Sequence, residues 1–550
     1  MYDPTNPPFS HFTIGELLSI VALILAFMQL SSPMTRFRAR AWKINIYTLV
    51  SIVFVSVLFV IFAAILPFIP ETSIWIFGYP IFWEITSGLL LLFIAARLLW
   101  KLNQPAVFCK KNAIAYGNAC AHAIAAGTIE SLAMLAEEIQ VSIEPIFEKY
   151  AKYTPVKIQT SQQTKIQFQP IDSKMTEIAN TLLDLWSDEL FCKVIVTQVP
   201  GTAIMIIEQI IKNGRDRFGY ALCQQLINQA FQNKNSILMR ETKYSGLGFI
   251  KQYMNTVFGN WNFIESYYNP LRSWHFYDQE VSLWQVEKYC ECVEVALTTY
   301  TRTNGAYGRS YPIQIAFENL ARITSGQAST LEHINTENVY RSVPYEIICC
   351  IGSGISKLLD IIIEQDIEPP QDTFDQNNYD HTKDYSVYAV IAKGIYEYYA
   401  GVARCHKHDR ALRICAIESW TKIFLTMVGD TASQQNKKNR IAKRLIFHLN
   451  EQIDENLDSN RKYYPAITRL LISINTIFEP TIVENNDLGT QFHYAFIQKL
   501  KNLYPQIHVK DIGFASDLLP EDVTYNEELG QLHQALMRQR KLVLQLNLLG

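Results

Sequence analysis

Residues 44–70 read INIYTLVSIVFVSVLFVIFAAILPFIP and contain no charged side chain. A helix needs about 20 mainly apolar residues to cross the hydrocarbon core of a bilayer. The stretch therefore predicts a transmembrane helix over about residues 45–69. Weaker apolar runs on either side of it predict two further spans, over about residues 12–31 and 79–100.

Positive charge is distributed unevenly around these runs. No Lys or Arg precedes Arg36, and none lies between Lys43 and Arg97. Because short basic loops stay in the cytoplasm, this asymmetry predicts an N-terminus outside and everything after about residue 101 inside. We therefore expect an integral protein of the inner or plasma membrane with a three-helix anchor over 1–103, in contact with the lipid bilayer.

The charge of the whole chain and the positions of its cysteines indicate the class of partner and the state of the thiols. The chain holds 49 Lys and Arg against 52 Asp and Glu, and this balance makes nucleic acid an unlikely partner class. All ten cysteines follow the predicted anchor, on the side expected to be reducing. We therefore expect ten free thiols. They are Cys109, Cys120, Cys192, Cys223, Cys290, Cys292, Cys349, Cys350, Cys405 and Cys415.

The cytoplasmic part is predicted to be mostly α-helical. A juxtamembrane helix is expected over 104–152, followed by a small β-hairpin near 155–170, where VKIQTSQQTKIQF alternates apolar and polar residues. Helical periodicity then dominates and indicates a helical bundle or an irregular α-solenoid-like stack. The polar segment 366–384 divides this part into a cytoplasmic helical domain over 153–368 and a C-terminal helical domain over 385–550. The last helix is expected over 526–547.

Small residues recur at spacing four in the juxtamembrane helix, which lets another helix approach closely. The neighbour is either a helix of the same chain or a second copy, and the candidate self-association residues are Gly117, Ala121 and Ala125. A second row of the same spacing holds Ala115, Ala119, Ala123 and Gly127.

The stretch 244–284 is rich in aromatic residues and broken by Gly and Pro. Such rings fill a core beneath a long loop or line a groove for a ligand or peptide. We expect Trp261 and Phe263 to be buried. One of Tyr267, Tyr268 or Trp274 is expected to be exposed at a groove. The candidate recognition residues are Trp261, Tyr267, Tyr268 and Trp274.

Basic residues also share one helical face near residue 440. Lys437, Arg440 and Arg444 are candidates for contact with lipid or phosphate, and the alternative is a solvated surface face. The Cys405–Asp409 run lacks a fourth ligand for tetrahedral zinc, so no metal site is predicted.

No catalytic motif is recognisable, so the sequence predicts no catalytic residue and no cofactor. It favours a non-enzymatic, membrane-anchored sensor or scaffold that binds a protein or ligand at the inner membrane face. Two alternatives stay open. One is an oligomeric effector that permeabilises the bilayer, and the other is an enzyme whose site is assembled from scattered residues.

Overall fold

The structure, a computed structural model, is mostly helical, which confirms the mostly α class. It divides into two compact units, Met1–Ile237 (unit 1) and Leu238–Gly550 (unit 2). The described residues are 32–42, separate positions within 51–65, 80–150, 153–160, 163–170, 173–213, 218–241, 251–272, 281–304, 311–364, 374, 384, 386–405, 407–424, 430–457, 466–475, 488–510, 519, 523–526, 531–536 and 539–545.

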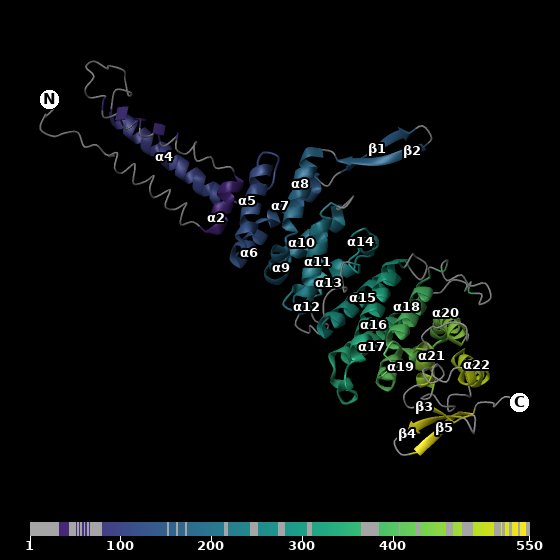
Figure 1. Cartoon of the computed structure of the whole chain (residues 1–550). Helices are drawn as coiled ribbons and strands as arrows, with labels where there is room; N and C mark the ends of the chain where they lie inside the picture. Colours follow the sequence, from purple (N-terminus) through teal and green to yellow (C-terminus); the bar gives the residue numbers. More distant parts are fainter. Residues whose placement is uncertain are drawn as a thin grey trace, which may run out of the picture. The chain divides into compact units, whose positions relative to one another are not determined.

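Unit 1 contains α2, α4 and the helices and strands that follow them in the chain (Figure 1). They are α2 (Pro33–Ala41), α4 (Pro80–Asn103), α5 (Ala113–Ala126), α6 (Ile129–Glu138), α7 (Gln140–Tyr150), β1 (Tyr153–Thr160), β2 (Gln163–Pro170), α8 (Ser173–Trp186), α9 (Glu189–Gln198), α10 (Pro200–Asn213) and α11 (Tyr220–Gln232). A short α12 (Ile237–Arg240) begins where unit 1 ends.

The predicted apolar runs are described in part. The third run is the helix α4, and the described positions of the middle run are helical. Phe59 and Phe62 of the middle run pack on Trp83 of α4, with ring centroids 5.3 and 5.1 Å apart. The first run, over 12–31, lies outside the described residues.

The length and apolar composition of the described helices bear on the predicted spans. Among the described residues, no single helix has the length and apolar composition expected of a membrane span. The pair α9 and α10, bent by 110° at Val199, passes that test only when the two helices are taken together.

The single helix expected over 104–152 is wrong, because three shorter helices occupy this range. The first, α5, ends where Gly127 adopts a φ of 64°, a left-handed conformation that favours glycine. The next begins immediately, since the Thr128 side chain accepts a hydrogen bond from Ser131 N–H as an N-cap. These breaks turn α6 back against α5, which leaves space for α2 beside both helices.

After α7 the chain forms two antiparallel strands, β1 and β2. Their register runs from Tyr153 opposite Pro170 to Thr160 opposite Gln163.

Unit 2 begins with short helices and continues with long ones. The first group is α13 (Gln252–Phe258), α14 (Trp261–Glu265), α15 (Leu283–Asn304), α16 (Tyr311–Leu331), the 3₁₀ helix η3 (Thr336–Arg341) and α17 (Val343–Glu364). The second is α18 (Val387–Val402), α19 (Asp409–Phe424), α20 (Ala432–Leu457), α21 (Ala466–Asn475), α22 (Leu488–Lys510), β3 (Val523–Asn526), β4 (Gln531–Leu536) and β5 (Gln539–Gln545).

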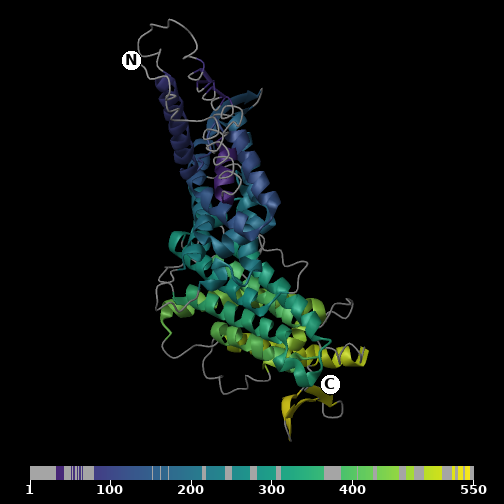
Figure 2. The ribbon, with the colours of Figure 1, turned by 90° about the vertical axis from the view of Figure 1, so that its left-hand side faces the viewer.

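Each long helix of unit 2 packs mainly against the helix two places along the chain, so these helices stack in two rows. One row is α15, α17, α19 and α21, and the other is α16, α18, α20 and α22. Figure 2 shows the teal to green helices of these rows lying side by side. The segment 366–384, predicted as a domain boundary, falls inside unit 2, and only Phe374 and Asp384 of it are described.

The helix expected over 526–547 is wrong. In its place β3, β4 and β5 form an antiparallel three-stranded sheet in that order. Short Leu-containing runs such as QLHQAL suit a strand as well as a helix, so periodicity alone did not separate them.

Candidate functional site

The short helix α2 forms the base of the candidate site in unit 1. It begins at Pro33, a residue whose fixed φ suits the first helical position, and the Ser32 side chain accepts a hydrogen bond from Thr35 N–H. Arg36 and Arg40 lie one turn apart and share a face, while Arg38 lies on another side of the helix.

Arg38 joins three segments that lie far apart in sequence. Its guanidinium donates to both carboxylate oxygens of Glu138 on α6, at 2.9 and 2.7 Å. It also donates to the carbonyl oxygens of Leu102 and Asn103 at the end of α4, at 2.9 and 3.0 Å. This bidentate, charge-assisted arrangement fixes the position of α2 beside the C-terminal end of α4.

The acid of this pair is almost fully buried. The Glu138 side chain is 3% exposed and that of Arg38 is 14% exposed. Glu138 also accepts a hydrogen bond from Ala106 N–H at 2.7 Å. Removing either charge would leave the other buried without its partner, which is strongly destabilising. The pair is therefore needed for the packing of α2 against α6.

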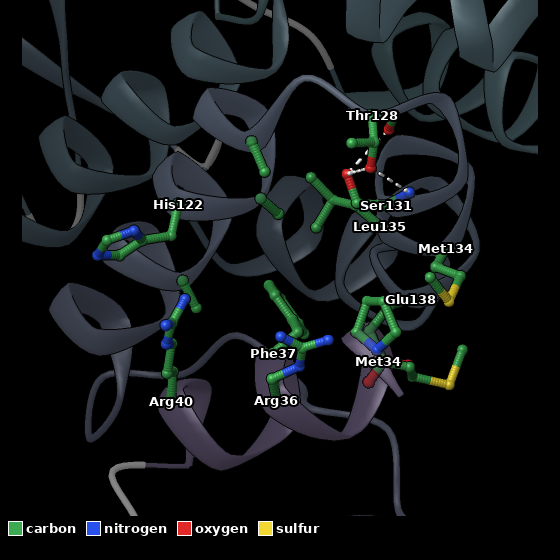
Figure 3. A pocket seen from close by; sticks show the side chains of 14 residues that line it. Met34, Arg36, Phe37, Arg40, His122, Thr128, Ser131, Met134, Leu135 and Glu138 are labelled. Carbon is green, nitrogen blue, oxygen red and sulfur yellow. Dashed lines mark hydrogen bonds between the residues drawn. The ribbon is translucent and has the colours of Figure 1, made fainter. Parts of the chain in front are cut away.

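A pocket of about 270 Å³ lies between α2, α5 and α6. Figure 3 shows Arg36 and Arg40 rising from α2 into the pocket, with His122 of α5 on the same side as Arg40. The remaining wall is largely apolar. It is formed by Pro33, Met34, Phe37, Ala119, Ala123, Ala126, Met134 and Leu135.

The pocket carries an excess of positive charge. Arg36 and Arg40 are exposed, and neither has an ion-pair partner within the described part of the chain. Glu138 is the acid in the lining, and its carboxylate is already bound by Arg38 and Ala106. The hydroxyl groups of Thr128 and Ser131 at the edge are hydrogen-bonded to each other at 2.7 Å. The arrangement is therefore suited to an anion.

The two small-residue rows of α5 have different environments. Ala119 and Ala123 face α2 and line the pocket, so the close approach predicted for their row is made by α2. A Cβ on Gly117 would meet nothing within 4 Å, and Ala125 is exposed. Ala121 is half-buried. The self-association of this face stays a prediction.

The aromatic segment of unit 2 is largely a core. Trp261, Phe263 and Tyr268 are 3%, 3% and 5% exposed, whereas Tyr267 is 51% exposed. The burial expected for Trp261 and Phe263 is therefore confirmed, and Tyr267 is an exposed ring among the candidates. Trp274 lies outside the described residues. A recognition role for this segment stays a prediction.

The basic residues of α20 point inward, contrary to both expectations for them. Lys437, Arg440 and Arg444 are 2%, 6% and 4% exposed. Arg444 Nε donates to Asp384 at 2.7 Å, and Lys437 Nζ donates to the Ile363 carbonyl at 3.3 Å. These cations have partners inside unit 2, so they form neither a solvated face nor a surface for lipid or phosphate.

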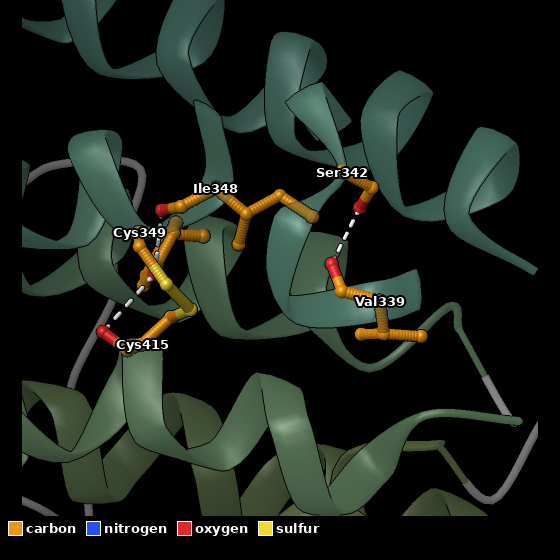
Figure 4. Close-up of a disulfide and its surroundings, with 6 residues drawn as sticks. Val339, Ser342, Ile348, Cys349 and Cys415 are labelled. Atoms are coloured by element: carbon orange, nitrogen blue, oxygen red, sulfur yellow. Dashed lines mark hydrogen bonds between the residues drawn. A yellow bond between two sulfur atoms is a disulfide. The ribbon is translucent and has the colours of Figure 1, made fainter. Parts of the chain in front are cut away.

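Two cysteines contradict the expectation of ten free thiols. Cys349 of α17 and Cys415 of α19 form a disulfide with an S–S distance of 1.97 Å (Figure 4). Their Cα atoms are 4.6 Å apart, within the range that a disulfide spans. Gly352 permits this approach, because a Cβ there would overlap the Cys415 carbonyl oxygen. The positions of the cysteines in the sequence do not show that α17 and α19 bring these two thiols together.

A second cysteine pair joins Cys350, the residue after Cys349 on α17, to Cys290 of α15. The Cys290 thiol of α15 donates a hydrogen bond that lowers the pKa of Cys350, and the same contact raises the pKa of Cys290. A Cβ on Gly354 would come within 2.8 Å of Cys290 Sγ, so glycine again allows the two helices to approach. The two pairs therefore tie three helices of one row together.

The sequence singles out parts of the pocket but does not show that they lie together. The basic cluster that begins at Arg36 predicts membrane topology, and the row of small residues that includes Ala119 predicts a packing face. Ser32-Pro33 is a helix start signal that could have placed Arg36 and Arg40 on one face. Glu138 carried no signal, since it lies 100 residues from its partner Arg38.

Among the residues that the structure describes, no group of three or more His, Cys, Asp or Glu side chains is placed to hold a metal ion. No family model, curated protein or solved structure matches this chain.

Proposed function

We propose that this chain is a membrane-anchored helical sensor or scaffold that binds a ligand or protein at the inner membrane face. The observation that carries the proposal is the contact made by Arg38. It holds the loop between the first two apolar runs against the end of α4 and against α6 of the helical region. A change at the pocket is thereby linked to the predicted anchor.

The positions of these groups support the proposed topology. A three-pass anchor places the loop after the first span and the end of the third span on the same side of the membrane. Arg38 binds the carbonyls of Leu102 and Asn103, and Lys101 Nζ lies 6.0 Å from the Trp42 ring. Arg38 and Lys101 therefore lie at the same end of α4.

Exposed apolar surface supports a lipid environment for α4. Large side chains that are 55% to 67% exposed recur along this helix, more than a helix in water usually presents together. They are Ile85, Leu89, Leu92, Phe93 and Trp100.

The two helix rows of unit 2 support the scaffold part of the proposal. Stacked rows of this kind are the arrangement of α-solenoids, which present extended surfaces to partners. In unit 2 we place the partner surface at the exposed ring of Tyr267.

An oligomeric effector that permeabilises the bilayer is the second candidate. It is favoured by the open face of α5 at Gly117 and Ala125, which a second copy could cover. Mass measurement of the protein in mild detergent separates the two, because the effector requires a defined oligomer.

Thiol labelling in intact cells tests the proposed topology. With a membrane-impermeant maleimide, a Ser73→Cys variant should be labelled, and an Ala125→Cys variant should be labelled only after the membrane is opened. The matched control is the wild type, whose native thiols are predicted to lie inside. Labelling of Ala125→Cys but not of Ser73→Cys in intact cells contradicts the proposal.

A further inference from the structure

We propose that the pocket between α2, α5 and α6 binds the phosphate group of an anionic amphiphile, with a phospholipid headgroup as its source. The location of the pocket at the inner membrane face rests on the proposed function. The phosphate chemistry follows from the side chains that line the pocket.

The charge of the lining selects an anion. Arg36 and Arg40 lie one turn apart and both reach into the pocket, where His122 adds a ring nitrogen (Figure 3). A planar guanidinium donates two parallel hydrogen bonds to a phosphate, so two neighbouring guanidinium groups can bind several phosphate oxygens. The one carboxylate in the lining, Glu138, is neutralised by Arg38 and does not oppose such an anion.

The size and apolar wall of the pocket define the rest of the ligand. A volume of about 270 Å³ lies just below the usual range for small-molecule sites, so it suits a headgroup rather than a whole lipid. Phe37 and Leu135 are buried beneath the pocket, and Met34 and Met134 stand at its wall as adaptable apolar contacts. A phosphate with an attached apolar chain satisfies both parts of this surface.

The pocket is held open by features of the chain itself. Beside His122, its α5 wall is made of Ala119, Ala123 and Ala126, whose short side chains leave room in front of the arginines. The Arg38–Glu138 pair and its contacts with the end of α4 fix α2 at this distance. The two cations of the pocket are therefore presented by a braced helix rather than by a mobile loop.

Binding of short-chain lipids to the full chain in uncharged detergent tests the proposal. The probes are dihexanoyl phosphatidic acid, dihexanoyl phosphatidylcholine and glycerol 3-phosphate, measured by titration calorimetry. The wild type should bind phosphatidic acid at least tenfold more tightly than phosphatidylcholine or glycerol 3-phosphate. Loss of two charge-assisted contacts in Arg36→Gln/Arg40→Gln should weaken the binding of phosphatidic acid by at least about tenfold.

Two control variants distinguish the pocket from general basic charge. Lys110→Gln/Lys111→Gln removes the same amount of charge just before α5, at residues outside the lining, and it should keep affinity within about twofold. Ala123→Leu fills the pocket without changing charge and should also weaken binding, whereas Ala125→Leu on the exposed side of α5 should not. Ala123→Leu keeps the test valid if the arginine variant fails to fold.

Two outcomes of these titrations would overturn the proposal. Equal losses in the two charge variants would overturn it, because binding would then be nonspecific. Equal affinity for glycerol 3-phosphate and phosphatidic acid would overturn the lipid source and leave a soluble phosphate ester as the ligand. Since these titrations are made in detergent, they can fail while Ser73→Cys labelling still supports the membrane topology, and the reverse also holds.

Discussion

Two basic helices of this protein, α2 in unit 1 and α20 in unit 2, have similar charge patterns and opposite environments. Arg36 and Arg40 are exposed and face an open pocket. Arg440 and Arg444 are 6% and 4% exposed and are held by groups of unit 2. Spacing along a helix places cations on one face, but the acids and carbonyls opposite that face determine whether the cations are available to a ligand.

The same contrast extends to the surroundings of the two helices. Around α2, small side chains leave a cavity, whereas α17 uses Gly352 and Gly354 for close contacts with cysteines or their backbone. The row of α15, α17 and α19 is tied by one disulfide and one thiol pair. We therefore expect substitutions in unit 2 to affect stability, and substitutions in the pocket of unit 1 to affect binding.

Removal of the disulfide should have the largest effect. The disulfide joins residues with a sequence separation of 66. For a closed loop of that length, the entropy of the unfolded chain gives about 4 kcal/mol of stabilisation. Cys415→Ser should lower the free energy of unfolding of unit 2 by about that amount in urea denaturation without reductant. With dithiothreitol present the difference from wild type should largely disappear. A mass measurement without reductant that finds ten free thiols would show that the disulfide is absent. The expected contrast between a cross-linked unit 2 and unit 1 would then be lost.

The next effect is expected from Arg38→Ala, which lies on the same short helix as the pocket arginines. It leaves the nearly buried Glu138 carboxylate without its partner and should destabilise unit 1 by about 3 kcal/mol. The midpoint of thermal unfolding followed by circular dichroism measures it. A matched control is Arg36→Ala, and an equal shift for both variants would show that α2 has no distinct structural arginine.

The Arg444–Asp384 pair predicts a dependence of stability on pH. Burial alone raises the pKa of Asp384, but hydrogen bonds from Ser386 and Arg444 outweigh it and lower the pKa. A lowered carboxyl pKa gives stability that is fully present above the unfolded value of about 3.9 and is lost as pH falls through the folded value. Denaturation midpoints measured below about pH 4 should fall less steeply for Asp384→Asn. Identical pH profiles would mean that the pair contributes nothing.

The smallest stability effect is expected from the pocket itself. Arg36→Gln/Arg40→Gln removes two exposed cations without ion-pair partners in the described residues, so the free energy of unfolding should change by less than about 0.5 kcal/mol. Chemical denaturation beside the wild type checks this. A loss comparable to that of Arg38→Ala would place these arginines in the fold instead of the site.

The sequence predicted the parts of this molecule that depend on local pattern. The helical class, the helix of the third apolar run and the burial of Trp261 follow from composition and periodicity. The pairing of Arg38 with Glu138, of Asp384 with Arg444, and of Cys349 with Cys415 did not follow, because each joins residues at least 60 positions apart. The pocket was missed for the same reason, since α2 and α5 meet only through tertiary packing.

Arginine footprinting on membranes tests the central comparison most directly. A membrane-impermeant, arginine-directed dicarbonyl reagent is applied to the unaltered full chain in inside-out vesicles, and modification is read at each arginine by mass spectrometry. We predict that Arg36 and Arg40 are modified rapidly, that anionic lipid slows their reaction, and that Arg440 and Arg444 stay unmodified until the protein unfolds. Modification of Arg440 and Arg444 as fast as that of Arg36 and Arg40 would contradict the account.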